Sequence, residues 1–232
     1  MRAQISFGNA AADWAQLMIR DVERTRSAII EVATKEFSLR GYSGGRVNEI
    51  GKRTRTSKRM IYYYFGSKEA LYRAVLAGYY RRLHRAHSSA DLMQMDPLQG
   101  LVSLTRSTFD WHLHFASEVP LVMYENIHSG IHIGSLSTSE NLRSTAIDVV
   151  EDIYHRGVAD GSMRPNLRPI DIYNAIVSAS FFNVSNRYTF RAIFGHDMSS
   201  PEEIELRRES LIDSVTRYVA ANSRCQTSPP NH

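Results

Sequence analysis

Two short helical patterns flank a polar turn between residues 46 and 71. In the first pattern Val47 and Ile50 share one face, and in the second Ile61 and Phe65 lie one turn apart. Because residues three or four positions apart lie on the same side of a helix, the two helices can bury one shared apolar seam. The segment therefore predicts a pair of short helices that pack together and leave their opposite faces free.

The second helix of this pair begins with positive charge. Ser57 is a suitable N-cap, so the helix should start at Lys58 and Arg59 and continue through the tyrosines at positions 62–64. The helix macrodipole favours anions at this end, so cations there suggest an anion supplied from outside the protein. DNA phosphates would supply it, and a helix with donors at its N-terminal end commonly reads a major groove.

Charge is distributed unevenly along the 232 residues, although the net charge is only +4. Residues 1–90 contain 17 basic and 7 acidic side chains, a balance of +10, whereas residues 91–232 contain 11 and 17, a balance of −6. A basic run alone is more often a solvated surface. The asymmetry instead favours a domain that binds double-stranded DNA, joined to a domain with another role.

Several motifs at fixed spacings lie between residues 24 and 76. They are Phe37-Ser38-Leu39-Arg40-Gly41-Tyr42, Val47-Asn48-Glu49-Ile50, Ser57-Lys58, Ile61-Tyr62-Tyr63-Tyr64-Phe65 and Ser67-Lys68-Glu69-Ala70-Leu71. In this combination the chain resembles the TetR/AcrR family of transcriptional regulators. The resemblance implies an all-α fold of about nine helices, with an N-terminal three-helix helix-turn-helix domain and a C-terminal helical domain for ligand binding and dimerisation. It also implies a homodimeric repressor that a small-molecule effector releases from its operator.

One turn position departs from the family pattern. The family often has an Ala-Gly-Val-Ser-like turn, whereas this chain has Thr54-Arg55-Thr56-Ser57, so Arg55 occupies the glycine-like position. If that position requires a positive φ, Arg55 carries strain of about 1 kcal/mol. We expect the departure to affect the turn geometry and the operator sequence rather than the fold.

Side chains of the reading helix differ in the DNA groups they suit. Lys58 and Arg59 are expected at base edges, because Lys and Arg pair with the guanine O6 and N7 acceptors. Tyr62 and Tyr64 suit phosphates or sugars, whereas Tyr63 could equally pack against the fold. A lysine at the start of the next helix can hold a phosphate together with the helix amides. The expected DNA contacts are Arg46, Thr56, Ser57, Lys58, Arg59, Tyr62, Tyr63, Tyr64 and Lys68.

Beyond residue 65 the apolar residues follow a helical period, with almost no alternating strand pattern. Pro169 can open one helix, Gly161 can end another, and Ser200-Pro201 can start the last. Helices are expected at residues 68–87, 98–117, 120–127, 140–159, 169–194 and 201–221, which makes nine with the first three.

The chain is expected to have four parts. They are an N-terminal extension at residues 1–23, the helix-turn-helix domain at 24–70, the regulatory and dimerisation domain at 71–222, and a tail at 223–232. The extension is expected to be a short amphipathic helix or a mobile arm. Its arginines Arg20, Arg24 and Arg26 could touch DNA beside the main site, although a solvated extension is favoured.

Composition predicts a cytoplasmic protein with no membrane partner. No apolar stretch approaches the ~20 residues that span a bilayer, and the N-terminus lacks the pattern of a secretory signal. The single cysteine, Cys225, cannot form an internal disulfide, which is consistent with a reducing compartment.

The helix expected at residues 169–194 is apolar on more than one side, which exceeds the needs of one intramolecular core. With the final helix it is expected to form a two-fold, four-helix interface between subunits. Such a dimer would place its reading helices ~34 Å apart, or a multiple of that distance, so the operator should be a near-palindrome. The expected interface residues are Ile172, Ile176, Phe182, Ile204, Leu211 and Val215.

Aromatic and polar side chains gather in the middle of the C-terminal region, which suits a pocket for an effector of unknown identity. An aromatic stripe at helical spacing also forms ordinary core, so both interpretations stay open. The pocket candidates are Phe109, His112, Tyr124, Asn126, Ser178 and Phe181.

The sequence does not predict an enzyme, a cofactor or a metal site. The pairs His84/His87 and His128/His132 have same-face helical spacing but lack a carboxylate or thiolate in a recognised ligand pattern. There is no phosphate-binding loop or nucleophile elbow, so no catalytic residue is proposed. The remaining alternative is an architectural DNA-binding protein or an activator that needs no ligand. Ligand-induced loss of operator binding would separate the two.

Overall fold

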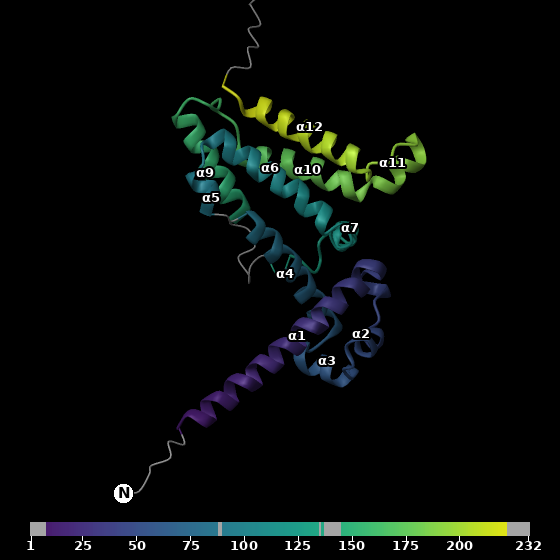
Figure 1. Cartoon of the computed structure of the whole chain (residues 1–232). Coiled ribbons are helices and arrows are strands. Elements are labelled where there is room, and N and C mark those ends of the chain that lie inside the picture. The colour runs from purple at the N-terminus through teal and green to yellow at the C-terminus, as the bar shows by residue number, and fades with distance from the viewer. Residues whose placement is uncertain (1–7, 88–89, 135, 137–144, 222–232) are drawn as a thin grey trace, which may run out of the picture. The chain divides into compact units, whose positions relative to one another are not determined.

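The computed structural model describes residues 8–87, 90–134, 136 and 145–221, and these residues are mostly helical (Figure 1). Within this part of the chain the β pairing consists of one isolated bridge, between Met163 and Ala220. The all-α fold class is therefore confirmed. The helices are α1 (Gly8–Gly44), α2 (Val47–Thr54), α3 (Lys58–Phe65), α4 (Lys68–His87), α5 (Ala90–Gln94), α6 (Pro97–His114), α7 (Val119–Ile127), α9 (Thr145–Ala159), α10 (Pro169–Ser185), α11 (Arg187–Phe194) and α12 (Pro201–Val219).

Two differences raise the number of helices in the described residues above the nine expected. Residues 90–94 form α5, which the sequence pattern did not predict. The helix expected at residues 169–194 divides into α10 and α11, because Asn186 has φ −105° and ψ 2°, outside the α-helical region. From Gly8 onward, the expected N-terminal extension continues into α1, which breaks only at Gly41.

The chain divides into two compact units, with the boundary between Leu76 and Ala77, within α4. The first unit contains α1, α2, α3 and the start of α4. The second contains the rest of α4 and the helices from α5 to α12. Residues 140–144 of the helix expected at 140–159 lie outside the described residues.

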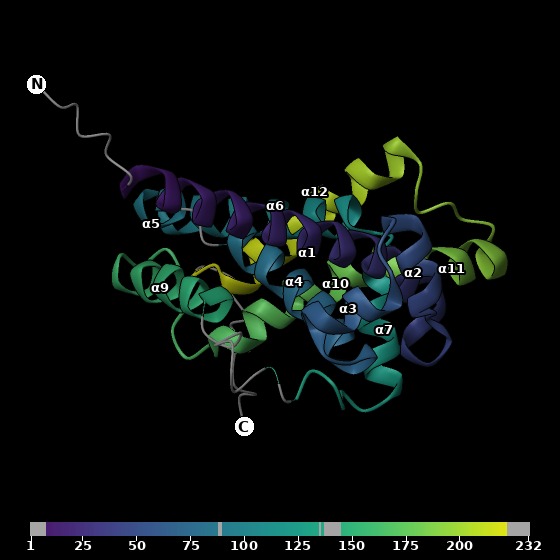
Figure 2. The same ribbon diagram turned by 90° about the horizontal axis from the view of Figure 1, so that it is seen from below.

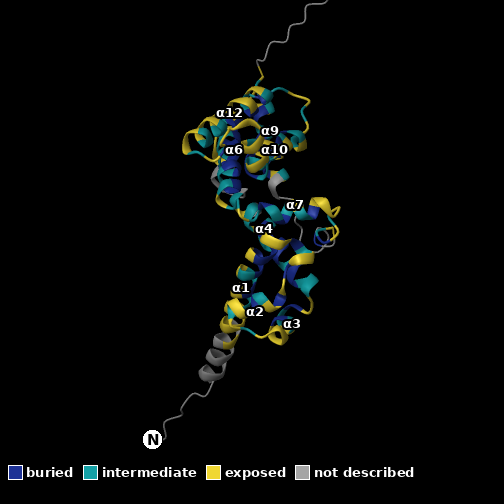
Figure 3. Cartoon of the chain, turned by 90° about the vertical axis from the view of Figure 1, so that its right-hand side faces the viewer, coloured by how far each residue is buried: buried dark blue, intermediate teal, exposed yellow. Residues whose placement is uncertain are grey.

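The apolar seam predicted between α2 and α3 is the centre of the first unit. Ile50 and Ile61 are completely buried, and Val47 and Phe65 are nearly so. Figure 3 shows buried residues on the inner sides of α1, α2 and α3. The other helices contribute Ile29, Ala33, Phe37, Leu71, Tyr72 and Val75 to the same core.

In the second unit α6, α9, α10 and α12 pack around one hydrophobic core (Figures 1 and 2). The predicted cap of α12 is confirmed, since the Ser200 hydroxyl accepts from the Glu203 amide at 3.3 Å and Pro201 follows it. Gly161 has φ 79°, as expected for the end of α9. The core includes Leu101, Leu104, Phe109, Val150, Ile153, Ile172, Ile176, Leu211, Val215 and Val219.

Candidate nucleic-acid interface

The turn between α2 and α3 is tight because Gly51 has no side chain. The Thr56 amide donates to the Gly51 carbonyl at 2.9 Å, and a Cβ at Gly51 would lie 2.5 Å from the Thr56 carbonyl oxygen. Ser57 caps α3 as predicted, since its hydroxyl accepts from the Met60 amide at 3.2 Å. These contacts fix where α3 begins and therefore which side chains lie at its exposed end.

Arg55 ends α2 in the left-handed region, with φ 53° and ψ 34°. The structure therefore confirms that the glycine-like turn position needs a positive φ. An L-residue is disfavoured there by roughly 1–2 kcal/mol because its Cβ approaches the following carbonyl oxygen. The Arg55 side chain is exposed, so no burial offsets this strain.

Replacing Arg55 with glycine should raise the free energy of unfolding by about 0.5–1 kcal/mol. Glycine removes the Cβ clash, which stabilises the folded state. It also increases the conformational entropy of the unfolded state, which offsets part of this stabilisation. Urea unfolding followed by circular dichroism measures the change. The matched control is Arg53→Gly inside α2, which should lower the free energy of unfolding by about 0.5–1 kcal/mol. Equal losses from the two substitutions would refute the strain at Arg55.

α3 separates a buried face from a polar one. Ile61 and Phe65 point into the core, whereas Lys58 and Arg59 are exposed and Tyr63 is 78% exposed. Of the two possibilities for Tyr63, packing in the core is therefore excluded. Among the described residues Arg59 makes no ion pair or side-chain hydrogen bond, so its guanidinium group is available to a ligand.

The other two tyrosines of α3 are half-buried beside the exposed cations. The Lys58 ammonium lies 5.6 Å from the centroid of the Tyr62 ring, within the range of a cation–π contact. The rings of Tyr63 and Tyr64 meet edge-on with centroids 5.5 Å apart. Cationic and aromatic groups thus share the free surface of α3, which suits both phosphates and base edges.

One contact that the sequence did not reveal ties α3 to α1. The Arg26 guanidinium donates to the Tyr64 carbonyl and lies 4.6 Å from the centroid of the Phe65 ring. The sequence alone allows Arg26 to touch DNA, but the structure shows its guanidinium bound within the first unit. No local pattern could identify this contact, because 38 residues separate Arg26 from Tyr64.

A second contact that the sequence did not reveal lies at the start of α2. The buried carboxylate of Glu36 accepts from the Arg46 amide at 3.1 Å and pairs with Arg40 at 3.2 Å. The Arg46 backbone is thereby held while its side chain stays exposed. Thr56 is half-buried, and its hydroxyl donates to the Thr54 carbonyl at 3.2 Å.

Lys68 lies at the first turn of α4 and contacts its own unit. Its ammonium donates to the Ser43 carbonyl at 3.2 Å and lies 5.0 Å from the centroid of the Tyr42 ring. Partial burial lowers the pKa of Lys68 from its ordinary value. The Ser67 hydroxyl caps α4 by accepting from the Ala70 amide at 3.0 Å. Lys68 thus supports the fold at the position where it could also hold a phosphate.

In the second unit three of the six effector-pocket candidates line two separate cavities. Phe109 and Ser178 line a groove of about 410 Å³ where α10 and α12 meet, whereas Tyr124 lines a cavity of about 290 Å³ beside α7, α10 and α11. His112 and Phe181 contact each other, with ring centroids 5.9 Å apart. Burial lowers the pKa of His112. The sixth candidate, Asn126, is exposed.

Most residues expected at a dimer interface belong to the core of the second unit. Phe182 is 42% exposed, and Ile204 is half-buried against the core. The apolar surplus of α10 is therefore largely covered by α6, α9 and α12. The buried four are Ile172, Ile176, Leu211 and Val215.

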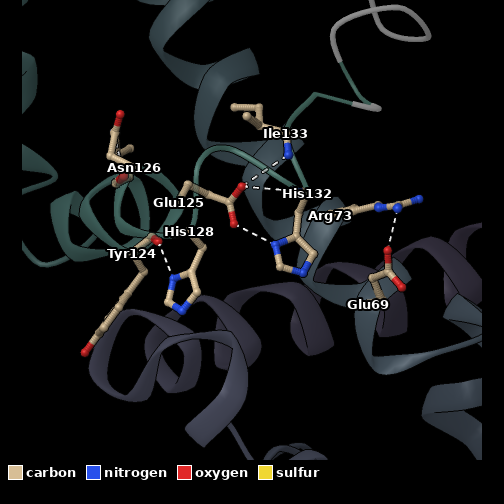
Figure 4. Close-up of polar contacts among 9 residues, drawn as sticks. Glu69, Arg73, Tyr124, Glu125, Asn126, His128, His132 and Ile133 are labelled. Atoms are coloured by element: carbon tan, nitrogen blue, oxygen red, sulfur yellow. Dashed lines mark hydrogen bonds and ion pairs between the residues drawn. The ribbon is translucent and has the colours of Figure 1, made fainter.

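A buried carboxylate organises the end of α7 (Figure 4). Glu125 accepts from His132 Nδ1 at 2.8 Å and from the amides of His132 and Ile133 at 3.2 Å. His128 Nδ1 lies 2.7 Å from the Tyr124 carbonyl oxygen. Of the His128/His132 pair, only His132 contacts this carboxylate, and the contact stabilises the turn after α7.

Metal-binding and membrane-spanning features were sought in the same described ranges. They contain no group of three or more His, Cys, Asp or Glu side chains that could hold a metal ion. Every helix in them is too short or too polar to cross a bilayer.

The helix-turn-helix of the first unit and the helical second unit define a DNA-binding transcriptional regulator. Residues 29–75 match the model for bacterial regulatory proteins of the tetR family, and residues 97–215 match the tetracyclin repressor-like C-terminal domain. The chain is 32% identical over 183 residues to the helix-turn-helix transcriptional repressor NicS of Pseudomonas putida, covering 79% of this chain and 86% of NicS. The chain belongs to the tetR family of transcriptional regulators, whose members are not enzymes.

Solved structures share the fold. A tetR-family regulatory protein from Rhodococcus RHA1 superposes with a TM-score of 0.66 at 19% identity, covering 84% of this chain and 97% of that one. The transcriptional regulator SCO4942 of Streptomyces coelicolor has a TM-score of 0.64 at 25% identity, covering 84% of this chain and 98% of that one.

Proposed function

We propose that this regulator represses transcription by binding a near-palindromic operator as a homodimer, and that a small-molecule effector releases it. The carrying observation is the exposed start of α3, where Lys58 and Arg59 project from a helix whose other face is buried. The similarity to the repressor NicS supports repression. We assign DNA binding to residues 24–70, and regulation and dimerisation to residues 71–222, in the cytoplasm.

We assign base contacts to Lys58 and Arg59, at the leading end of α3. Tyr62, Tyr63 and Tyr64 suit the phosphates and sugars beside them, because each hydroxyl can donate one directional hydrogen bond. The Ser57 hydroxyl accepts from the cap amide and still has a proton to donate. Flanking phosphate contacts are assigned to Arg46, Thr56 and Lys68.

Replacing Lys68 with methionine should weaken binding to operator and unrelated DNA by a similar factor. Loss of one phosphate contact should reduce the slope of log K against log salt by about 0.9 for each subunit. Loss of the bond to Ser43 should also lower the free energy of unfolding by about 1 kcal/mol. Fluorescence anisotropy titrations on both DNAs at several salt concentrations measure the slope. The matched control, Lys35→Met at an exposed position, should leave the salt slope unchanged. If Lys68→Met weakened binding to the operator alone and not to unrelated DNA, Lys68 would not contact a phosphate.

We propose that the two subunits of the homodimer contact each other through the face of α10 and α12 that lines the 410 Å³ groove. Small side chains line it on both helices, and they allow two helix pairs to approach closely. A two-fold axis would bring the same face of a second copy against it, as in a four-helix arrangement. These small residues are Ala175, Ser178, Ala179, Ser210 and Ser214.

For the effector we propose the 290 Å³ cavity beside α7. Tyr124, Met123 and Val184 give it a mainly apolar lining, and Arg187 adds a polar group that can orient a ligand. The protein would have one conformation that fits the operator and one that does not. An effector would release DNA only if its affinity for the second conformation exceeded its affinity for the first.

Repression and activation predict opposite results in the host. Deleting the gene should raise transcription from the promoter that contains the operator, because a repressor has been removed. A fall would support the activator. No change in transcription, together with operator binding that no ligand affects, would support the architectural protein.

A further inference from the structure

The C-terminal end of α3 has backbone carbonyls that need partners from outside the regular helix. The last four carbonyl groups of a helix have no amide partner within it. The Gly66 amide donates to the Tyr62 carbonyl at 2.7 Å, and the Tyr64 carbonyl accepts from the Arg26 guanidinium of α1. A helix of eight residues is unstable alone, so the direction of α3 depends on its contacts with the rest of the first unit.

Arg26 holds this end of α3 in two ways. Its guanidinium donates to the Tyr64 carbonyl, which places a positive charge at the negative end of the helix macrodipole. The same group lies 4.6 Å from the centroid of the Phe65 ring, within the range of a cation–π contact. Arg26 therefore contacts both the backbone and a core side chain of the last turn of α3.

The contact with Arg26 restricts α3 in a way that its apolar side chains do not. Ile61 and Phe65 pack in the seam with α2, and burial of apolar surface has no preferred direction. A hydrogen bond, in contrast, requires a defined distance and angle between donor and acceptor. With Ser57 capping the other end, Arg26 limits the tilt and rotation of α3 that the seam alone would tolerate.

Small changes in the direction of α3 matter because its opposite end carries Lys58 and Arg59. The eight residues of α3 span ~12 Å, so a tilt of ~10° about one end moves the other end by about 2 Å. A rotation about the helix axis turns every side chain by the same angle. Specific recognition requires its groups to be held within about 0.5 Å of the productive geometry. Base contacts are therefore lost when α3 shifts by this amount.

We propose that Arg26 is a positioning residue for base reading, which fixes the tilt and rotation of α3 without contacting DNA. The inference rests on the proposed function of α3 and assigns sequence specificity to a residue outside that helix. Loss of Arg26 should then weaken binding to the operator more than binding to unrelated DNA. Loss of a phosphate contact would weaken both alike, because phosphates carry no sequence information.

The test is the ratio of the affinities of Arg26→Met for an operator selected from random DNA and for unrelated DNA, measured by anisotropy. Methionine keeps an unbranched chain but has no donor and no charge. We expect the ratio to fall at least ~5-fold for each half-site, which is the loss of about one base contact. The matched control is Arg24→Met, which removes the same charge from an exposed position of α1 and should leave the ratio unchanged.

A combination with Arg59→Ala separates positioning from an independent effect. If Arg26 acts through the side chains of α3, Arg26→Met should lower the ratio by a smaller factor in Arg59→Ala than in the wild type, because the two residues serve the same base contacts. Equal factors in the two backgrounds would overturn the inference.

Two further outcomes separate the inference from the proposed function. An unchanged ratio in Arg26→Met that circular dichroism shows to be folded would overturn the inference and leave sequence-specific binding intact. A wild-type protein that binds all DNA sequences equally would overturn the proposed function itself. If methionine prevents folding, Arg26→Gln carries the same expectation, because its amide group ends short of the position of the guanidinium. An unchanged ratio in that variant would also contradict the positioning role.

Discussion

Replacing Arg59 with alanine is expected to lower operator affinity by ~5–150-fold for each half-site and to relax discrimination at one base pair. A bidentate contact of arginine with guanine contributes about 1–3 kcal/mol to discrimination against other bases. Arg59 can make such a contact because it is exposed at the start of α3 and makes no ion pair within the described residues. Anisotropy titrations with operators carrying each base at every position measure both effects.

Lys35→Ala is the matched control for Arg59→Ala, because it removes one positive charge from an exposed position of α1 in the same unit. It should lower affinity slightly and equally for all sequences. If Arg59→Ala behaves in the same way, with every base preference retained, then Arg59 contacts the backbone and α3 reads bases through other side chains.

Replacing Ala179 with arginine is expected to abolish dimerisation and, with it, tight operator binding. Ala179 is exposed and lines the groove between α10 and α12. An arginine there would be buried without a partner in each copy, at a cost of about 3–5 kcal/mol per unpaired charge. The dissociation constant should therefore rise by at least ~10³-fold. Sedimentation measures the dimer, and anisotropy measures operator binding.

The control for this variant is Asn174→Arg, which adds the same charge at an exposed position of α10 outside the groove lining. It should leave the dimer intact. Unchanged dimerisation in Ala179→Arg would move the interface away from α10 and α12.

Local signals in the sequence predicted most of the helix-turn-helix. The spacing of Val47, Ile50, Ile61 and Phe65 predicted the seam, and all four are buried. The departure at Arg55 predicted a strained turn because its glycine-like position has a positive φ. These features depend on neighbours within one or two turns, so a single sequence contains the information that they need.

Contacts between distant residues were not predictable in this way. Arg26 contacts α3, 38 residues along the chain, and Glu36 contacts Arg46, ten residues along, and neither separation is a helical spacing. The apolar pattern of α10 also did not predict which side of the helix faces the core of the second unit. Ile172 and Ile176 face α6, α9 and α12, whereas Ala179 and Phe182 stay exposed, because those helices cover only part of α10.

The central claim is that two copies of α3 read one operator. Selection of bound sequences from random double-stranded DNA tests it most directly. The proposal predicts an inverted repeat whose half-sites are ~34 Å apart or a multiple of that distance, about 10 base pairs for each turn. A single non-repeated site, or half-sites at variable spacing, would contradict a two-fold dimer with two reading helices.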